Sequence, residues 1–162
     1  MNITMFGFGN VARGFVELLV KRREALAADY GFAPKVIAIL TRRGAALDPE
    51  GLDLSREIVF TQTPVSVEAA LAGADVVVEV TPTDVQTGGA GLVHCRAALN
   101  MGKHVVTANK GPLVVAYREL AALAKSKGVQ FRFEGTVMGG TPAMVLGLET
   151  LAAAGVRSVK GI

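Results

Sequence analysis

Cysteine, tryptophan and long uninterrupted apolar segments are scarce or missing in this sequence. Its 162 residues include one cysteine, Cys95, and no tryptophan. A single cysteine cannot form an intrachain disulfide, which favours a reducing, cytoplasmic compartment. The longest uncharged segment, residues 135–148, is broken by glycines and by Pro142, so it is a poor membrane span. We therefore expect no membrane partner, and we interpret Cys95, which lies among apolar residues of a predicted helix, as a packing residue.

A strong excess of one charge is missing as well. The formal net charge is +3, and the basic residues do not gather into a long run with interleaved aromatic side chains. Nucleic-acid binding needs such a basic footprint, so no nucleic-acid partner is expected. Lys21, Arg22 and Arg23 lie within a predicted helix, and we interpret them as its solvated face.

Glycine, by contrast, occurs near the start of the chain in a pattern typical of nucleotide-binding loops. A strand-forming run, residues 2–6, leads into Gly7 and Gly9, and a segment with helical periodicity follows. With Ala12 the pattern is G-x-G-x-x-A, a variant of the dinucleotide-binding fingerprint. Gly7 permits the tight turn, and Gly9 has no Cβ, so a pyrophosphate can approach the backbone and the first N–H groups of the helix. The alternative is a strand–helix turn with a purely structural role.

The rest of the chain alternates between strand and helix patterns. Nearly continuous apolar runs at 35–41 and 75–81 are typical of strands buried on both faces of a parallel sheet. A helix is expected to end at about residue 100, and the next strand to run from His104 into the segment 108–110. We expect an α/β Rossmann-type, doubly wound and mostly parallel sheet with helices on both faces. Residues 1–162 then form one NAD(P)-binding domain.

Weaker patterns give further expectations. Residues 45–63 are expected to be irregular, with a short strand at 58–60, and a short helix is expected at 67–71. Apolar and polar residues alternate at 129–134, which predicts a strand with one less buried face. A glycine-rich turn then leads to a helix over 142–154. Residues 156–162 have a strand pattern with no closing element after it, which predicts an incomplete protein.

The residues after the second strand bear on cofactor choice. NAD-dependent enzymes place an acidic residue there to hold the ribose 2′-hydroxyl, whereas an arginine accommodates a 2′-phosphate. Here Thr41 is followed by Arg42 and Arg43, and the first acid is Asp48. A guanidinium pairs with phosphate through parallel hydrogen bonds. We predict NADP as the preferred cofactor, with Thr41, Arg42 and Arg43 in its site; a merely polar turn is the alternative.

Two further strand ends supply candidate site residues, because ligands of α/β sheets lie beyond the carboxyl ends of the strands. Thr81, Pro82 and Thr83 are expected beside the adenosine or ribose half of the cofactor. Asn109 and Lys110 follow the strand that starts at His104, and we expect Gly111 and Pro112 to turn the chain sharply there. Lys110 then lies near the nicotinamide end, where it could bind a substrate carboxylate or the carbonyl oxygen that receives hydride. The alternative for Lys110 is an exposed turn lysine, and His104 is interpreted as structural.

These motifs together resemble the N-terminal, nucleotide-binding part of homoserine dehydrogenase, over the whole length of the chain. The segments that carry the resemblance are 7–11, 79–83, 102–112 and 133–142. The resemblance implies interconversion of homoserine and aspartate 4-semialdehyde with NAD(P)H, on the route to threonine and methionine. It implies cofactor contacts by Phe8, Asn10, Val11, Thr81 and Lys110, and it assigns Lys110 to the active site as a catalytic residue.

The same resemblance implies a monovalent cation, usually sodium. The loop that holds it corresponds here to Glu134, Val137, Gly139 and Thr141, whose carbonyl oxygens suit a hard cation. Two positions depart from the family pattern. Ala12 replaces the commoner third glycine, and Met138 stands where the family often has glycine.

In the family, this part leads into a substrate-binding and dimer-forming domain that supplies acidic substrate ligands and a second lysine. That domain is expected to be absent from this chain. We therefore expect the chain alone to bind NADP with little or no turnover of homoserine, and the full-length protein to be a homodimer. Another amino-acid dehydrogenase of similar build, or an NADP-binding module without catalysis, remains the alternative.

Overall fold

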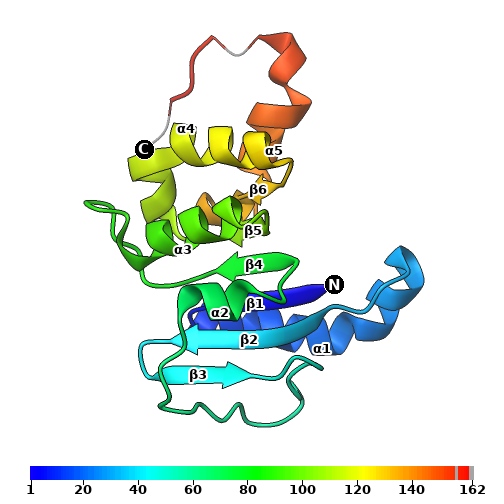
Figure 1. Cartoon of the computed structure of the whole chain (residues 1–162). Coiled ribbons are helices and arrows are strands. Elements are labelled where there is room, and N and C mark those ends of the chain that lie inside the picture. Colours follow the sequence, from blue (N-terminus) through cyan, green and yellow to red (C-terminus); the bar gives the residue numbers. More distant parts are fainter. Residues whose placement is uncertain (156, 161–162) are drawn as a thin grey trace.

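The computed structural model describes residues 1–155 and 157–160, and it contains one six-stranded sheet in the order β3-β2-β1-β4-β5-β6 (Figure 1). Every neighbouring pair runs parallel except β2 and β3, which are antiparallel. The predicted mostly parallel α/β sheet is therefore confirmed. The strands are β1 (Asn2–Phe6), β2 (Lys35–Thr41), β3 (Gly44–Leu47), β4 (Val76–Glu79), β5 (His104–Thr107) and β6 (Phe131–Arg132).

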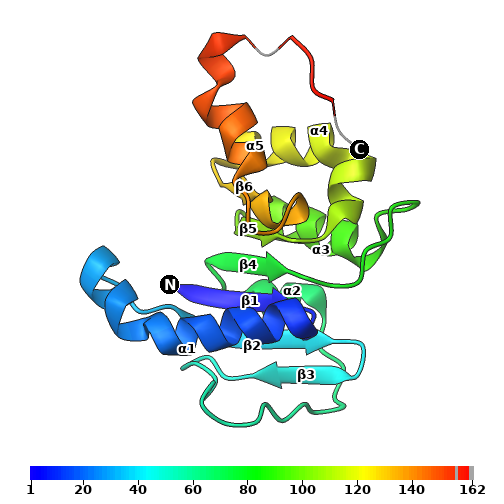
Figure 2. The ribbon, with the colours of Figure 1, turned by 180° about the vertical axis from the view of Figure 1, so that it is seen from behind.

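Helices cover both faces of the sheet. Helix α1 lies on one face and α2, α3 and α4 lie on the other, as the two opposite views show (Figures 1 and 2). Gly31 ends α1 in a left-handed conformation, with φ of 72°. Within the described residues, no helix combines the length and the apolar character that crossing a membrane requires. The principal helices are α1 (Asn10–Tyr30), α2 (Val67–Leu71), α3 (Gly89–Asn100) and α4 (Lys110–Lys127).

The core consists of two apolar clusters, one on each side of the sheet. Phe6 and Val77 belong to the cluster under α3 and α4, whereas their neighbours Met5 and Val78 belong to the cluster under α1. Side chains of a strand alternate between faces, so strands covered on both sides need apolar residues at every position. Cys95 is buried in the first cluster, which confirms its packing role. Lys21, Arg22 and Arg23 are exposed on α1, as predicted.

The segment 45–63 differs from expectation. It begins with the edge strand β3, which the sequence did not predict, and residues 58–60 form no strand. A single antiparallel bridge joins Ala45 to Thr61 instead. The short alanine-rich β3 lacks the β-branched residues that mark a strand, and its pairing with β2 alone defines it.

Two predicted strands end earlier than expected. Strand β4 stops at Glu79 rather than at residue 81, and β5 stops at Thr107. Lys110 is the first residue of α4, so Gly111 and Pro112 lie in its first turn rather than in a sharp turn between elements. The Asn109 side chain accepts a hydrogen bond from the Gly111 N–H, 3.0 Å away, and so caps the helix.

The C-terminal expectations are the least accurate. Only Phe131 and Arg132 of 129–134 pair with β5, and Glu134 begins the 3₁₀ turn η1 (Glu134–Thr136). The helix expected at 142–154 is divided into α5 (Ala143–Val145), the π-helical η2 (Leu146–Thr150) and η3 (Ala152–Ala154). These three turns bury no residue, so packing does not hold them to one regular helix.

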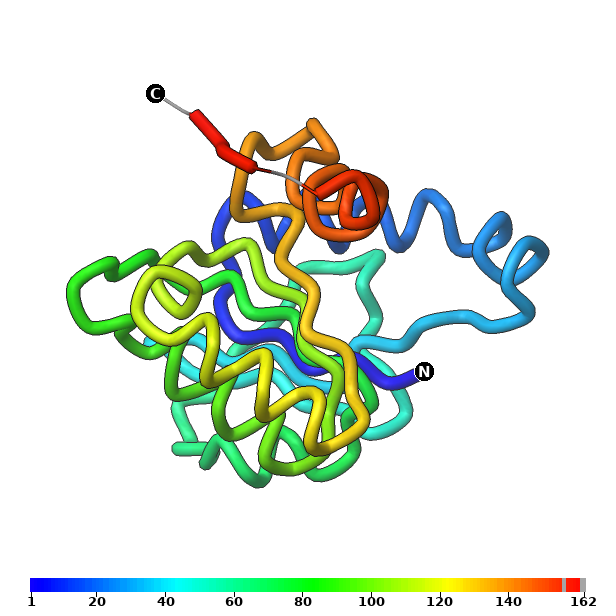
Figure 3. Tube along the Cα trace, turned by 90° about the horizontal axis from the view of Figure 1, so that it is seen from above, coloured from blue at the N-terminus to red at the C-terminus, as the bar shows by residue number. Residues whose placement is uncertain are grey.

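Residues 133–155, which follow β6, lie on the same side of the sheet as α1 when the molecule is viewed from above (Figure 3). The strand expected at 156–162 falls partly outside the described residues, namely at 156, 161 and 162. Residues 157–160 have no strand structure.

Candidate functional site

A cleft of about 1490 Å³ opens at the carboxyl edge of the sheet, where β1, β2, β4 and β5 end. It is larger than the roughly 300–1,000 Å³ of typical small-molecule pockets, which suits an extended ligand. Residues from five separate segments of the chain meet there, and most of the predicted cofactor residues are among them. Those that line the cleft are Gly7, Phe8, Gly9, Val11, Thr41, Arg42, Arg43, Thr81, Pro82, Thr83 and Lys110.

Two predicted residues are not part of this lining. Asn10 is exposed at the first position of α1. Asn109 is 1% exposed, so it is buried beside Lys110, which does line the cleft. The sequence analysis counts Asn109 among the cofactor residues, whereas the structure places it beside the cleft and outside its lining.

The glycine loop has the two properties that its motif requires. Gly7 has φ of +97°, and a Cβ there would lie 2.7 Å from the Val80 carbonyl oxygen, so a larger residue is strained and crowded. A Cβ on Gly9 would meet no atom within 4 Å. Gly9 is the N-cap of α1 and no side chain caps this helix. The first N–H groups of α1 therefore remain available to an anion.

Ala12 packs tightly behind this loop. It is fully buried and belongs to the core cluster between α1 and the sheet. The methyl group thus fits at the position where the motif often has its third glycine.

The turn after β2 holds two arginines at the edge of the cleft. The Arg43 N–H donates to the Thr41 hydroxyl, and the Gln62 side-chain amide donates to the Arg43 carbonyl oxygen, over 3.1 and 2.7 Å. These bonds fix the backbone of the turn and leave both guanidinium groups exposed. None of the ion pairs among the described residues involves Arg42 or Arg43.

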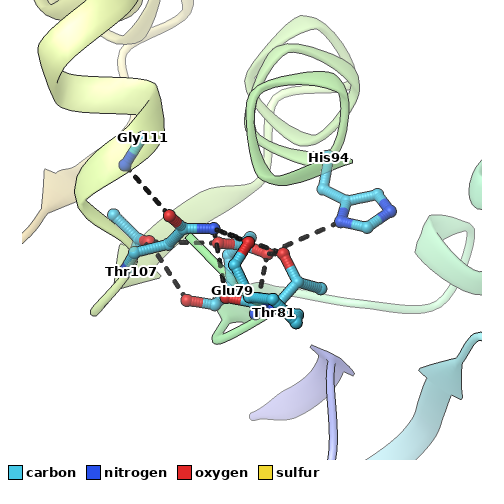
Figure 4. A network of polar contacts seen from close by, with 7 residues as sticks. Glu79, Thr81, His94, Thr107 and Gly111 are labelled. Carbon is cyan, nitrogen blue, oxygen red and sulfur yellow. Dashed lines mark hydrogen bonds and ion pairs between the residues drawn. The ribbon is translucent and has the colours of Figure 1, made fainter. Parts of the chain in front are cut away.

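The opposite wall of the cleft rests on a buried polar network. Glu79, the last residue of β4, is 0% exposed, and its carboxylate accepts hydrogen bonds from the Thr81 N–H, at 3.0 Å, and from the Thr81 hydroxyl. The Thr107 hydroxyl, at the end of β5, lies 3.0 Å from the Glu79 carbonyl oxygen and 3.3 Å from its Oε2. Figure 4 shows these groups converging between the ends of the two strands.

Lys110 is exposed at the mouth of the cleft. The Asn109 amide donates to the Thr81 carbonyl oxygen over 3.2 Å, so the start of α4 is bonded to the loop after β4. A Cβ on Gly111 would lie 2.5 Å from the Asp84 carbonyl oxygen, which shows how closely loop and helix approach. Hydrogen bonds from the Thr87 hydroxyl and from backbone N–H groups hold the pKa of Asp84 in this loop below its ordinary value.

Several lining residues escaped the sequence analysis. The Arg13 guanidinium lies 4.8 Å from the centroid of the Phe8 ring, and Phe8 also contacts Phe60 at a centroid distance of 5.6 Å. Arg13 gave a usable signal, because it follows the glycine motif within the first turn of the helix. The segment 54–58 gave none, since an irregular segment has no periodicity.

In the predicted cation loop, the Glu134 side chain bonds to backbone N–H groups of the chain itself. The Glu134 carboxylate accepts hydrogen bonds from the backbone N–H groups of Met144 and Val145, at 3.1 and 2.8 Å, and so caps α5. Met138 has φ of 51°, a left-handed conformation that favours glycine. Within the described residues, no three His, Cys, Asp or Glu side chains group as metal ligands.

Two other candidate groups have structural surroundings. Burial, reinforced by the nearby Glu79 charge, raises the pKa of the Cys95 thiol well above its ordinary value, so it is no nucleophile. His104 accepts a hydrogen bond at Nδ1 from the Gln130 N–H over 3.0 Å. Both observations agree with the structural roles expected for these residues.

Comparison with known proteins identifies similar chains. Residues 7–134 match the family model described as homoserine dehydrogenase, NAD binding domain. The homoserine dehydrogenase of Methanocaldococcus jannaschii is 38% identical over 100% of this chain and 52% of its own length. An NAD(+)-dependent homoserine dehydrogenase of Pseudomonas canavaninivorans is 34% identical over 99% of this chain and 50% of its own.

Solved structures agree with these sequence matches. An Archaeoglobus fulgidus protein described as a homoserine dehydrogenase superposes with a TM-score of 0.80 at 31% identity, over 94% of this chain and 48% of its own. A mutant hyperthermophilic archaeal homoserine dehydrogenase in complex with NADPH gives 0.72 at 27% identity, over 90% and 47% of the two chains. This chain thus spans about half the length of the curated relatives it matches.

Proposed function

We infer that this chain binds NADP for hydride transfer between homoserine and aspartate 4-semialdehyde, because it belongs to the family of homoserine dehydrogenase NAD-binding domains. The observation that carries the proposal is the cleft itself. It brings together an uncapped helix N-terminus, two arginines that form no ion pair within the described part of the chain, and an exposed lysine along one sheet edge.

The strand order indicates how a dinucleotide would be oriented along the cleft. The glycine loop after β1 is central, the arginines after β2 lie on one side, and β4 and β5 end on the other. With the pyrophosphate at Gly9, the adenosine 2′-phosphate would reach Arg42 and Arg43. The nicotinamide half would then lie against the wall formed by residues 81–83 and Lys110, which we call the β4–β5 wall. Because β4 lies on the side of β1 away from β2, we propose that Thr81, Pro82 and Thr83 contact the middle and the nicotinamide half of the cofactor, instead of the adenosine or ribose half expected from the sequence.

The residues of this chain then have distinct tasks. The N–H groups of the first turn of α1 bind phosphate oxygens, and Phe8 from the loop and Val11 from the first turn of α1 cover the cofactor. The Lys110 ammonium donates a hydrogen bond to the substrate oxygen and stabilises its negative charge. A bound nicotinamide cofactor supplies the hydride chemistry itself. A lysine at this end of the cleft favours a dehydrogenase over a module that only binds nucleotide.

Cofactor choice follows from charge at the end of β2. A carboxylate at this position would repel a 2′-phosphate, whereas two exposed guanidinium groups attract it. The relatives differ on this point, because one is described as NAD(+)-dependent and the structure of another is a complex with NADPH. We propose NADP for this chain because of its own Arg42 and Arg43.

The remaining parts of the proposal concern the whole protein. A sodium ion would bind mainly through the carbonyl oxygens of Val137 and Gly139, because the Glu134 and Thr141 carbonyls accept backbone hydrogen bonds from Val137 and Ala143. We propose that the full-length protein is a homodimer, and that substrate ligands come from outside these residues. The single buried Cys95 supports a reducing compartment such as the cytoplasm.

The proposal is tested by titrating the chain calorimetrically with NADP and NAD, followed by a homoserine oxidation assay on the same sample. We expect tight NADP binding, weaker NAD binding and little or no turnover. Failure to bind either nucleotide would contradict the proposed cofactor site. Full turnover by these residues alone would contradict the placement of the substrate ligands outside them.

A further inference from the structure

Glu79 is a fully buried acid that the proposed reaction does not use. Its carboxylate faces two threonines and His94, whose Nδ1 lies 3.6 Å from Oε1. Among the described residues, no lysine or arginine forms an ion pair with it. A buried carboxylate is unfavourable unless hydrogen bonds or a charge compensate it, so the groups that bond to Glu79 indicate what it does.

The contacts of Glu79 converge on the β4–β5 wall. Thr81 donates both its N–H and its hydroxyl to Oε1. The carbonyl oxygen of the same Thr81 accepts from the Asn109 amide at 3.2 Å, and Asn109 Oδ1 accepts from the Gly111 N–H. One carboxylate is therefore connected, through Thr81 and Asn109, to the helical turn that carries Lys110. Figure 4 shows Glu79 and Gly111 at the two ends of this connection.

The second connection runs through β5. The Thr107 hydroxyl bonds to Glu79 and accepts from the Asn109 N–H at 3.0 Å. Helix α3 seals the network from above, since a Cβ on Gly91 would overlap Asn109 Nδ2 and lie 3.0 Å from Glu79 Oε2. The network has little room to rearrange, so its geometry is transmitted to the wall.

His94 supplies the remaining side of the carboxylate. Its ring stacks on Phe6, with centroids 4.0 Å apart and an angle of 11° between the planes. Nδ1 is buried and, among the described side chains, it is the one buried nitrogen or oxygen without a hydrogen-bond partner. A proton on Nδ1 would face the acid at 3.6 Å, the arrangement in which a carboxylate selects a histidine tautomer.

We propose that Glu79, with His94, is a positioning residue that sets the geometry of the β4–β5 wall for the nicotinamide half of the cofactor. This inference rests on the proposed function, because it takes the cleft to be the NADP site. Glu79 itself touches no ligand. It holds Thr81 and, through Asn109, the turn of Lys110, and His94 carries its proton on Nδ1.

The test compares NADP with adenosine 2′,5′-bisphosphate, which lacks the nicotinamide half, by calorimetric titration of Glu79→Gln. We expect NADP affinity to fall by about tenfold or more and the affinity for the bisphosphate to stay within about twofold, because Arg42 and Arg43 lie on the other side of the cleft. Glu119→Gln is the matched control. Glu119 pairs with Arg96 between α3 and α4, outside the cleft, so both affinities should be unchanged.

Unchanged NADP affinity in Glu79→Gln would overturn the inference and leave the cofactor site standing. An equal loss for NADP and for the bisphosphate would also overturn it, since that result indicates general disruption. If the unaltered chain binds neither ligand, the proposed function fails and this inference with it.

A spectroscopic measurement tests the His94 part without relying on affinity. Nitrogen NMR of the labelled chain should show His94 protonated at Nδ1, and Glu79→Gln should shift the population toward the Nε2 tautomer. His104, which accepts a hydrogen bond at Nδ1, should keep its Nε2 proton in both proteins. An Nε2-protonated His94 in the unaltered chain would contradict the assigned pairing.

Discussion

Arg42 and Arg43 present their charge at a turn whose backbone is already fixed. Thr41 and Gln62 hold this backbone through hydrogen bonds, so replacing an arginine side chain should leave the turn intact. The substitution should therefore lower ligand affinity and not stability, because a phosphate left without its guanidinium loses charge-assisted hydrogen bonds.

Arg42→Ala is expected to weaken NADP binding by about tenfold or more, since hydrogen bonds to charged groups contribute about 1.5–3 kcal/mol. NAD binding should change little, because NAD has no 2′-phosphate. The measurement is the ratio of the two dissociation constants. Arg23→Ala, on the exposed face of α1, is the matched control. If Arg42→Ala and Arg43→Ala both keep the original ratio, the arginines do not select the cofactor.

Gly7→Ala should mainly lower stability, whereas Gly9→Ala should mainly lower NADP affinity. At Gly7 the left-handed backbone and the nearby Val80 carbonyl should lower the free energy of unfolding by about 1–3 kcal/mol. At Gly9 the added methyl group meets open space, so stability should fall by about 1 kcal/mol or less, while NADP affinity drops. Denaturant unfolding and calorimetry distinguish the two. A Gly9→Ala chain with unaltered NADP affinity would argue against close phosphate approach.

At the scale of elements, the contact between α3 and α4 positions the lysine side of the cleft. Leu120 is fully buried there, in the same cluster as Leu99 and Ala98. On the exposed surface between these helices, Arg96 forms a bidentate salt bridge with Glu119, with N–O distances of 2.6 and 2.7 Å. Helix α4 is interrupted at Ala116, where φ is −143°, so the helical piece that begins at Lys110 is separate from the piece that contains Leu120.

Leu120→Ala should lower the free energy of unfolding by about 2–5 kcal/mol, the usual range for a cavity left by a buried leucine. Val114, 66% exposed on the same helix, provides the control, since Val114→Ala should change stability by less than about 0.5 kcal/mol. Chemical denaturation measures both. Equal stabilities for the two variants would mean that α4 is not anchored through Leu120.

For the whole molecule, the cleft crosses the sheet edge from β2 to β5, so a bound dinucleotide would join segments that are far apart in the sequence. Residues 54–62 lie along one side of this cleft without forming a helix or a strand. A ligand that binds only the folded chain stabilises all of these segments together.

Saturating NADP should therefore stabilise the chain cooperatively. At a free concentration of 100 times the dissociation constant, the expected gain is about 2.7 kcal/mol, seen as a rise in the thermal midpoint. Arg42→Ala at the same NADP concentration should show a smaller rise. No rise for the unaltered chain at a concentration that saturates it in calorimetry would indicate that the unfolded chain binds as well.

The sequence by itself determined the parts of this protein that follow local rules. Continuous apolar runs predicted the central strands, and the glycine spacing predicted the loop before α1. The carboxyl ends of parallel strands share one edge, so the sequence predicts Arg42, Thr81 and Lys110 at a common site, and all three line the cleft. Local pattern and global topology agree in these segments.

Tertiary structure alone decided the rest. Strand β3 exists because β2 offers an edge to pair with, and the turns after η1 stay irregular because they bury nothing. Neither fact is visible in periodicity. Likewise, the sequence shows Glu79, His94 and Asn109 at separations of 15 or more residues, and only packing brings them into one network. Local sequence rules cannot predict such non-local contacts, which form when the folded chain brings distant segments together.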